Sequence, residues 1–483
     1  MRKLNPKKRV SDFFSLNRDQ TTLDFVDVPI GSDIPVFLDP SRIRCMDTTW
    51  AHECGALLQN FFQRLLDLIK ANKKSEGLVM LRGLSESNEF HLGFSKTFSQ
   101  GSGIGREFAE VFWTELGNSK AGKTGLLKDF EDACLFIEGV GPDRISDAVC
   151  NILRGPLIKY TQDMCAYYGI PLNSGVDSGA VWNPVSHVWE NDLVDLPVTP
   201  FGTLLLVPKI AVRHRFSYDY QSYYTHYLLP AMQLHEKSLN SALVYLLKDG
   251  TARVTKKSLR EKYGVDKLAV AEQTLLHPNV LDNYRKAVVR TSRPLTNDKF
   301  SEIENIDIPR YDSLLDSVIR LPVGRAAATD YENCIESLLS ALFFPSLVYP
   351  KKQEEIHDGR KRIDITYLNS AKDGFFGWLA SHYSSSHIFI ECKNYGNEVG
   401  NPEIDQIAGR FGPSRGQVGI LICRSLQNEK LFAKRLKDTA QDQRGYIIYL
   451  TDSDLEKLVE EYIRNGGMSD YTLLRDRFRA LIM

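Results

Sequence analysis

Two short runs of apolar residues, at 418–423 and 446–450, constrain the fold of this chain more than any other feature of its sequence. Neither run alternates between apolar and polar residues, and Gly or polar residues bound both of them. This pattern is typical of strands that are covered on both faces, as in the parallel sheets of α/β proteins. Residues 429–439 between the runs have helical spacing, so we expect a compact α/β layer fold here.

The elements before these two strands continue the same pattern. Apolar residues between Tyr331 and Leu342 recur at i, i+3 and i+4, which predicts the buried stripe of a helix. Residues 362–368 and 387–393 have the pattern of strands, and Asn401 with Pro402 suits the start of another helix. The order helix, strands, helix, strand, helix, strand predicts an α/β domain with an αβββαβ-like order over residues 325–483.

The part of the chain before this domain is longer and less regular. A chain of 483 residues exceeds one ordinary domain, and its best boundary is the segment 321–329, which precedes a strong helix start. We therefore expect residues 1–320 to form a mixed α/β region of unknown topology, possessing one domain or more. Its expected strands are at 25–30, 34–38 and 204–207, and its expected helices are at 51–70, 145–168 and 223–247.

Charge and cysteine content restrict the partners and the compartment. Sixty Lys and Arg residues against 61 Asp and Glu give a net charge of −1, so only local patches could hold a nucleic acid. The eight cysteines are scattered singly, which predicts reduced thiols rather than disulfides or a zinc site. The N-terminus lacks an apolar signal region and no long apolar run occurs, so we expect a cytoplasmic protein without a membrane partner.

The strand at 387–393 carries the most informative charged pair. Side chains alternate across a strand, so Glu391 and Lys393 share one face. Asp364 offers a second carboxylate from the preceding strand. Two carboxylates supply hard oxygen ligands suited to Mg²⁺, and the lysine can orient an attacking water or stabilise charge that grows on a phosphate.

A simpler alternative for these residues is a solvated sheet face with a weak salt bridge. Taken alone, this pattern of charges favours that alternative. The surrounding strands have the apolar pattern of buried elements, however, and a charge on such a strand is costly unless it is paired or bound to a metal. The predicted helix after the strand adds Gln406 and Arg410, one turn apart, on a face that can look toward the same cleft.

Together, Ile363-Asp364, Glu391-Cys392-Lys393 and Gln406 resemble the PD-(D/E)XK nuclease superfamily, the restriction-endonuclease-like fold, and above all its Mrr-like branch. The resemblance covers residues 325–460. It implies that Asp364 and Glu391 bind the metal and that Lys393 is the catalytic lysine. It also implies that Glu332, on the first helix, supports a metal-bound water and that Gln406 positions the site. The sequence departs from the family at Ile363, where Pro is usual, and in an insertion around 375–379 that reads as a helix or hairpin.

The resemblance implies a Mg²⁺-dependent endodeoxyribonuclease, with Mn²⁺ able to substitute, that hydrolyses the phosphodiester bonds of DNA. Large regions fused to such domains are typical of prokaryotic restriction and antiphage defence proteins, which implies a phage or host trigger or a partner protein. A homodimer would allow two sites to cut both strands. The alternative is a protein that binds nucleic acid or a partner through the same sheet without cleaving. The cations beside the site that could contact phosphates are Lys351, Lys352, Arg360, Lys361, Arg362, Arg410 and Arg415.

A third possibility is an NTPase switch, because residues 117–124 satisfy the pattern GxxxxGK[ST] through Gly122, Lys123 and Thr124. A working phosphate-binding loop follows a buried strand and opens a long helix. Here residues 106–116 have a helical pattern before the segment, and Gly125 follows it at once. We therefore interpret the segment as a Gly-rich loop.

Overall fold

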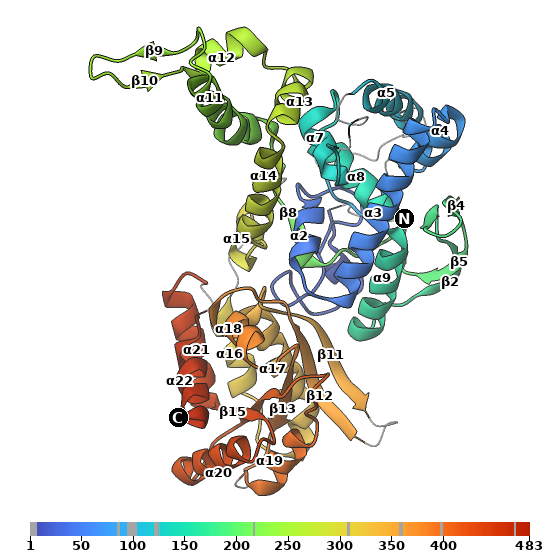
Figure 1. Cartoon of the computed structure of the whole chain (residues 1–483). Helices are drawn as coiled ribbons and strands as arrows, with labels where there is room; N and C mark the ends of the chain where they lie inside the picture. Colours follow the sequence, from blue (N-terminus) through green and yellow to red (C-terminus); the bar gives the residue numbers. More distant parts are fainter. Residues whose placement is uncertain are drawn as a thin grey trace. The chain divides into compact units, whose positions relative to one another are not determined.

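The computed structural model of the 483-residue chain describes residues 7–84, 87–93, 104–119, 124, 126–215, 218–306, 310–356, 361–396, 399–467 and 470–483 (Figure 1). Residues 120–123 of the GxxxxGK[ST] segment and Arg360 lie outside these ranges. The chain forms two compact units, unit 1 with residues 1–14 and 28–294, and unit 2 with residues 15–27 and 295–483. Within the described ranges, no helix combines the length and the apolar character needed to cross a membrane. All eight cysteines are free thiols.

Unit 1 consists mainly of helices, with short two-stranded ladders between them (Figure 1). Its helices are α1 Val10–Phe13, α2 Pro40–Cys45, α3 Thr49–Lys70, α4 Lys74–Arg82, α5 Ile104–Asn118, η1 Phe130–Asp132, α7 Ala133–Phe136, α8 Pro142–Ile152, α9 Arg154–Tyr168, η2 Lys209–Ala211, α10 Tyr220–Ser222, η3 Tyr223–Leu228, α11 Leu229–Ser238, α12 Lys256–Tyr263, α13 Lys267–Leu276 and α14 Pro278–Thr291. Its antiparallel pairs are β1 Phe37–Leu38 with β8 Val212–Arg213, β2 Asn173–Asp177 with β5 Leu193–Leu196, β3 Val181–Asn183 with β4 Val188–Glu190, β6 Val198–Thr199 with β7 Gly202–Thr203, and β9 Tyr245–Leu246 with β10 Ala252–Arg253.

The strand predictions for residues 1–320 were largely wrong. Residues 25–30 and 204–207 are mostly buried but form no named strand, and of residues 34–38 only β1 is a strand. Their backbone groups find single partners instead of a neighbouring strand. For example, the amide of Leu205 donates to the carbonyl of Glu89 at 2.9 Å. Burial therefore produced the apolar pattern here without a sheet.

Two expected helices of unit 1 also differ in extent. The helix expected at 223–247 ends at Ser238, and Asn240 then adopts a left-handed backbone with φ 48° before the β9–β10 hairpin. Asn tolerates this conformation better than most residues, so it ends the helix. The helix expected at 145–168 is divided into α8 and α9, and Pro156 lies in the first turn of α9, where its missing N–H leaves no bond unmade.

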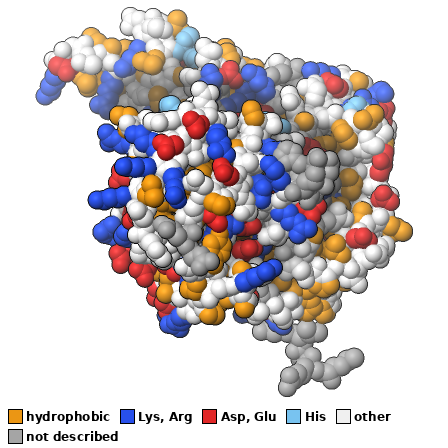
Figure 2. All heavy atoms as spheres, turned by 90° about the horizontal axis from the view of Figure 1, so that it is seen from below, with side chains coloured by type: hydrophobic (Ala, Val, Ile, Leu, Met, Phe, Trp, Pro, Cys, Tyr) orange, Lys and Arg blue, Asp and Glu red, His pale blue; other side chains and the backbone are white. Residues whose placement is uncertain are grey.

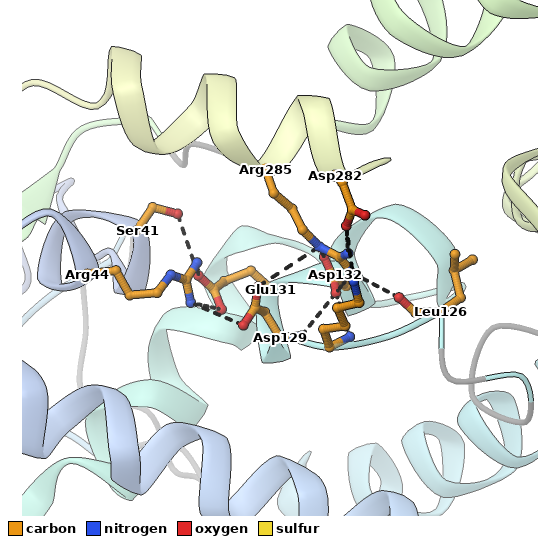
Figure 3. Close-up of polar contacts among 9 residues, drawn as sticks. Ser41, Arg44, Leu126, Asp129, Glu131, Asp132, Asp282 and Arg285 are labelled. Carbon is orange, nitrogen blue, oxygen red and sulfur yellow. Dashed lines mark hydrogen bonds and ion pairs between the residues drawn. The ribbon is translucent and has the colours of Figure 1, made fainter. Parts of the chain in front are cut away.

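A buried network of ion pairs joins three elements of unit 1 (Figure 3). Arg44 of α2 donates to Glu131 of η1, through Nη1 at 3.1 Å and also through Nη2. Arg285 of α14 donates to Asp132 of η1, with its Nε 3.1 Å from Oδ1. Glu131 and Asp132 are 1% and 0% exposed, so each arginine neutralises a carboxylate that has no access to water.

Unit 2 is built on a five-stranded sheet with the order β11-β12-β13-β14-β15. The pairs β11–β12 and β12–β13 are antiparallel, whereas β13–β14 and β14–β15 are parallel. The elements of unit 2 are α15 Asn297–Glu304, α16 Tyr311–Ile319, η4 Arg325–Ala327, α17 Ala328–Phe343, β11 Leu347–Ile356, β12 Lys361–Asn369, α18 Gly374–His382, β13 His387–Lys393, α19 Asn401–Ala408, β14 Val418–Cys423, α20 Glu429–Gln441, β15 Tyr446–Thr451, α21 Asp452–Arg464 and α22 Thr472–Ile482.

Helices cover both faces of this sheet (Figure 1). On one face, apolar residues of α16, α17, α18 and α21 pack against Ile390, Ile420 and other inward residues of the strands. On the other face, α19 and α20 pack against Leu421, Cys423 and Ile447. This arrangement confirms the expectation of a layered α/β domain whose central strands are covered on both sides.

Unit 2 contains residues 325–483, where the α/β domain was expected, and it also includes residues 15–27 and 295–324. β13 and β14 have the expected bounds, and the insertion around 375–379 is the helix α18. The division between the units falls before Leu295, ahead of the segment 321–329, because the preceding helix α16 contributes Tyr311 and Val318 to the core of unit 2. The sequence pattern did not predict β11, whose run of charged residues and Pro350 suits an irregular edge strand.

Candidate functional site

Asp364 lies where the strands β12 and β13 cease to pair. Their ladder runs from Leu368 opposite His387 to Ile365 opposite Ile390. Asp364 is the residue of β12 just before Ile365, and its Oδ2 atom accepts a hydrogen bond of 2.9 Å from the backbone N of Cys392. The side chain of Asp364 thus takes the place of a backbone acceptor, which fixes the carboxylate beside β13.

Glu391 lies on the central strand β13 and is 1% exposed. Its Oε1 atom accepts a hydrogen bond of 2.7 Å from Nζ of Lys393 and another from Nε2 of Gln406, on α19. Lys393 also donates to Oε1 of Gln406 at 3.1 Å. The two residues that share a face of β13 and the glutamine from the following helix therefore form one closed set of hydrogen bonds.

Glu332 approaches the same carboxylates from α17. Its Oε2 atom accepts a hydrogen bond of 3.1 Å from Nε2 of Gln353, on β11. Burial raises the pKa of Glu332, and the negative charge of Asp364 adds to this rise, so the two carboxylates are electrostatic neighbours. The structure thus brings together all five residues that the sequence predicted, with Glu332 at the margin of the set.

Gln353 is a residue of this site that the sequence did not indicate. It has a left-handed backbone, with φ 51°, on a strand whose register shifts between Val348 and Lys351. A residue other than Gly rarely adopts this conformation outside turns and functional sites. Because neither the bulge nor the conformation follows from a run of polar residues, no sequence signal could have found Gln353.

Negatively charged side chains predominate in the site. Burial and the charge of Asp364 raise the pKa of Glu391 to about 7, although Lys393 acts against this rise. Burial also raises the pKa of Asp364, whereas the hydrogen bond from Cys392, the charges of Lys393 and Arg410 and a hydrogen bond from Gln353 lower it. Carboxylates in such surroundings favour a proton or a bound cation.

The carboxylates of this site supply oxygen atoms of the kind that divalent cations bind. The Oε2 atom of Glu391 is buried and has no hydrogen-bond partner among the described residues, so a cation would supply the missing interaction. Across the described ranges, no group of three or more His, Cys, Asp or Glu side chains is arranged to hold a metal ion. The protein would therefore offer two carboxylates, Asp364 and Glu391, which suits Mg²⁺ because this ion keeps several waters.

Comparison with known proteins adds one match. Residues 15–219 match a family described as Domain of unknown function (DUF8370). This match does not include Asp364, Glu391 or the other residues of the candidate site. Neither a curated protein nor a solved structure matches the chain.

Proposed function

We propose that the chain is a Mg²⁺-dependent endonuclease that hydrolyses phosphodiester bonds of DNA, and that unit 2 is a restriction-endonuclease-like domain of the PD-(D/E)XK type. The observation that carries the proposal is the set of hydrogen bonds among Glu391, Lys393 and Gln406 beside Asp364. A surface salt bridge would leave both partners in water, but Glu391 is 1% exposed. A buried charged set with one unpartnered oxygen suits a reaction centre better than a structural contact.

Asp364 and Glu391 would hold the Mg²⁺ ion, and Mn²⁺ could substitute for it. When bound, the metal would lower the pKa of a coordinated water and neutralise charge on the phosphate. Lys393 has three N–H donors, and two of them point to Glu391 and Gln406. Its third donor is available to an attacking water or to a phosphate oxygen. Because the ammonium of Lys393 donates to both Glu391 and Gln406, the lysine is kept in one orientation.

Glu332 would stand outside the metal ligands, where Gln353 orients its carboxylate. The raised pKa of Glu332 makes this group a proton acceptor of greater strength than an ordinary exposed glutamate. We propose DNA as the substrate, and restriction or antiphage defence as the setting, from the resemblance of unit 2 to Mrr-like nucleases. Unit 1 would then recognise a trigger or partner.

A cleavage assay with the full chain tests the proposed function. The substrates are duplex DNA, single-stranded DNA and RNA, each with Mg²⁺, with Mn²⁺ and with EDTA. We expect metal-dependent products from DNA, and no products from the Asp364→Asn variant. Asp405→Asn serves as the matched control, because Asp405 is an exposed carboxylate on α19 that pairs with Arg444. Equal cleavage by the wild type and Asp364→Asn would refute the proposal, and DNA binding without any product would favour the non-cleaving alternative.

A further inference from the structure

Arg410 lies next to the candidate site without a partner of its own among the described carboxylates. It follows α19 by two residues, about one turn beyond Gln406, and its side chain is half-buried. Its Nε atom is buried and has no hydrogen-bond partner in the described part of the chain. Among the residues that the structure describes, the guanidinium makes no ion pair with a carboxylate. A desolvated donor without an acceptor is unfavourable, so this group would gain from an anionic ligand.

Arg410 lies close to the candidate active site, because it follows Gln406 by about one turn and the side chain of Gln406 contacts Glu391. Its positive charge acts on both Asp364 and Glu391 and opposes the rise in pKa that burial causes in these two groups. It is therefore near the two carboxylates without being bonded to either. A cation in this place can contact the oxygens of a phosphate group that lies against the carboxylate pair.

Three other cations around the site have partners. Arg362 pairs with Glu355 at 3.0 Å, and Lys352 pairs with Glu336 at 3.1 Å. Lys361 donates to the carbonyl of Gly409 at 2.8 Å. Figure 2 shows one face of the molecule, and there Lys and Arg side chains are mixed with Asp and Glu rather than gathered in one basic field. Within the described ranges, Arg410 differs from these three cations because its guanidinium donates to no acceptor.

The backbone that carries Arg410 is held in place. Nη2 of Arg415 donates to the carbonyl of Arg410 at 3.4 Å. The amide of Gly412 donates to Gly416 at 3.0 Å, and the amide of Gly416 donates back to Gly412 at 2.8 Å. These contacts close a tight loop directly after Arg410. The loop fixes the backbone from which the Arg410 side chain projects, which reduces the entropy lost when a ligand binds.

We infer that Arg410 binds a backbone phosphate of the nucleic acid next to the carboxylate pair. The inference rests on the proposed function for the identity of the ligand, a phosphodiester. The planar guanidinium can bind two phosphate oxygens at once, which a lysine cannot do. Arg410 would thus position the substrate, while Asp364, Glu391 and Lys393 act on the scissile bond.

Binding of a fluorescent DNA duplex by the full chain in EDTA tests this inference without any cleavage. Fluorescence anisotropy is measured between about 50 and 200 mM salt. The variants are Arg410→Gln, Arg410→Lys and the control Arg444→Gln, in which the lost arginine is already paired with Asp405. Loss of one phosphate contact lowers the slope of log K against log salt by about 0.9. We expect this change in Arg410→Gln, with binding weakened roughly tenfold, and a slope near the wild type in Arg410→Lys and Arg444→Gln.

The outcomes separate this inference from the proposed function. A wild-type slope in a folded Arg410→Gln protein would overturn the phosphate site, even if the wild type cleaves DNA. Absence of DNA binding by the wild type would overturn it as well. A reduced slope in Arg410→Gln would support the site even if no cleavage occurs under any condition. If Arg410→Gln fails to fold, Arg410→Lys decides by affinity, because loss of the planar fork should weaken binding several-fold.

Discussion

Replacement of Arg18 by Met tests how the N-terminal segment 15–27 stabilises unit 2. Glu336, on α17, is 0% exposed and accepts hydrogen bonds from both terminal nitrogens of Arg18. Lys352 lies 3.1 Å from the same carboxylate, and the hydroxyl of Ser340 donates to it at 2.8 Å. Removal of Arg18 therefore leaves a buried charge with two of its partners.

Loss of one partner from a buried ion pair costs about 3–5 kcal/mol when no other partner remains. Because Lys352 and Ser340 stay in contact with Glu336, we expect a loss of about 3 kcal/mol from the free energy of unfolding of unit 2. The matched control is Arg320→Met. Arg320 pairs with Asp316 at 2.6 Å, but the two side chains are 79% and 58% exposed. That change should cost less than about 0.5 kcal/mol.

Hydrogen exchange of the amides of α17, followed by mass spectrometry, measures this difference locally. A loss of about 3 kcal/mol corresponds to exchange that is roughly a hundredfold faster where opening of unit 2 governs the rate. Equal exchange in Arg18→Met and Arg320→Met would refute the reasoning. A double-mutant cycle with Glu336→Gln should show that the two changes are not additive.

The same pair predicts a dependence on pH. Burial acts to raise the pKa of Glu336, but the charges of Arg18 and Lys352 outweigh it and hold the pKa below its ordinary range. The pair therefore contributes its full stability above the pKa of an unfolded glutamate, about 4.3, and loses it as the pH falls through the lower folded value. The difference between Arg18→Met and the wild type should shrink below about pH 4.

Three further predictions concern the candidate site and unit 1. Burial and the charge of Asp364 raise the pKa of Glu391 to about 7. Ionisation of Glu391 should therefore reduce the free energy of unfolding of unit 2 as the pH rises from about 4 to above 7. Denaturation measured across this pH range should show a smaller reduction in the Asp364→Asn variant. Gln353→Gly should change the free energy of unfolding by less than about 1 kcal/mol, because Gly favours the left-handed backbone. The same change should lower the rate of cleavage roughly tenfold, because the contact with Glu332 is lost. An unchanged rate of cleavage would contradict the positioning role of Gln353. Arg285→Met should destabilise unit 1 by about 3 kcal/mol in urea denaturation. The double variant with Asp132→Asn should be less destabilised than the sum of the two single changes. Strict additivity of the two changes would argue against a buried ion pair.

The local sequence pattern predicted the part of the fold in which an apolar run is also a strand buried between helices. The apolar runs of β14 and β15 are covered on both faces by helices, and the alternation in β13 places Glu391 and Lys393 together. The same reasoning failed for residues 25–30 and 204–207, which are mostly buried but form no named strand. An apolar run reports burial, and it reports a strand only when a neighbouring strand exists to complete the hydrogen bonds.

The sequence by itself determined the inner strands of unit 2 and five residues that could act in its site, because side-chain periodicity along one strand or helix is a local property. Only the tertiary structure decided which distant segments meet. Arg18 contacts Glu336 across 318 residues of sequence, and Gln353 reaches Glu332 from an edge strand with no apolar pattern. Whether a given cation is paired, as Arg362 is, or retains free donors, as Arg410 does, depends on those contacts. Local periodicity carries no information about them, because they form only when the whole unit packs.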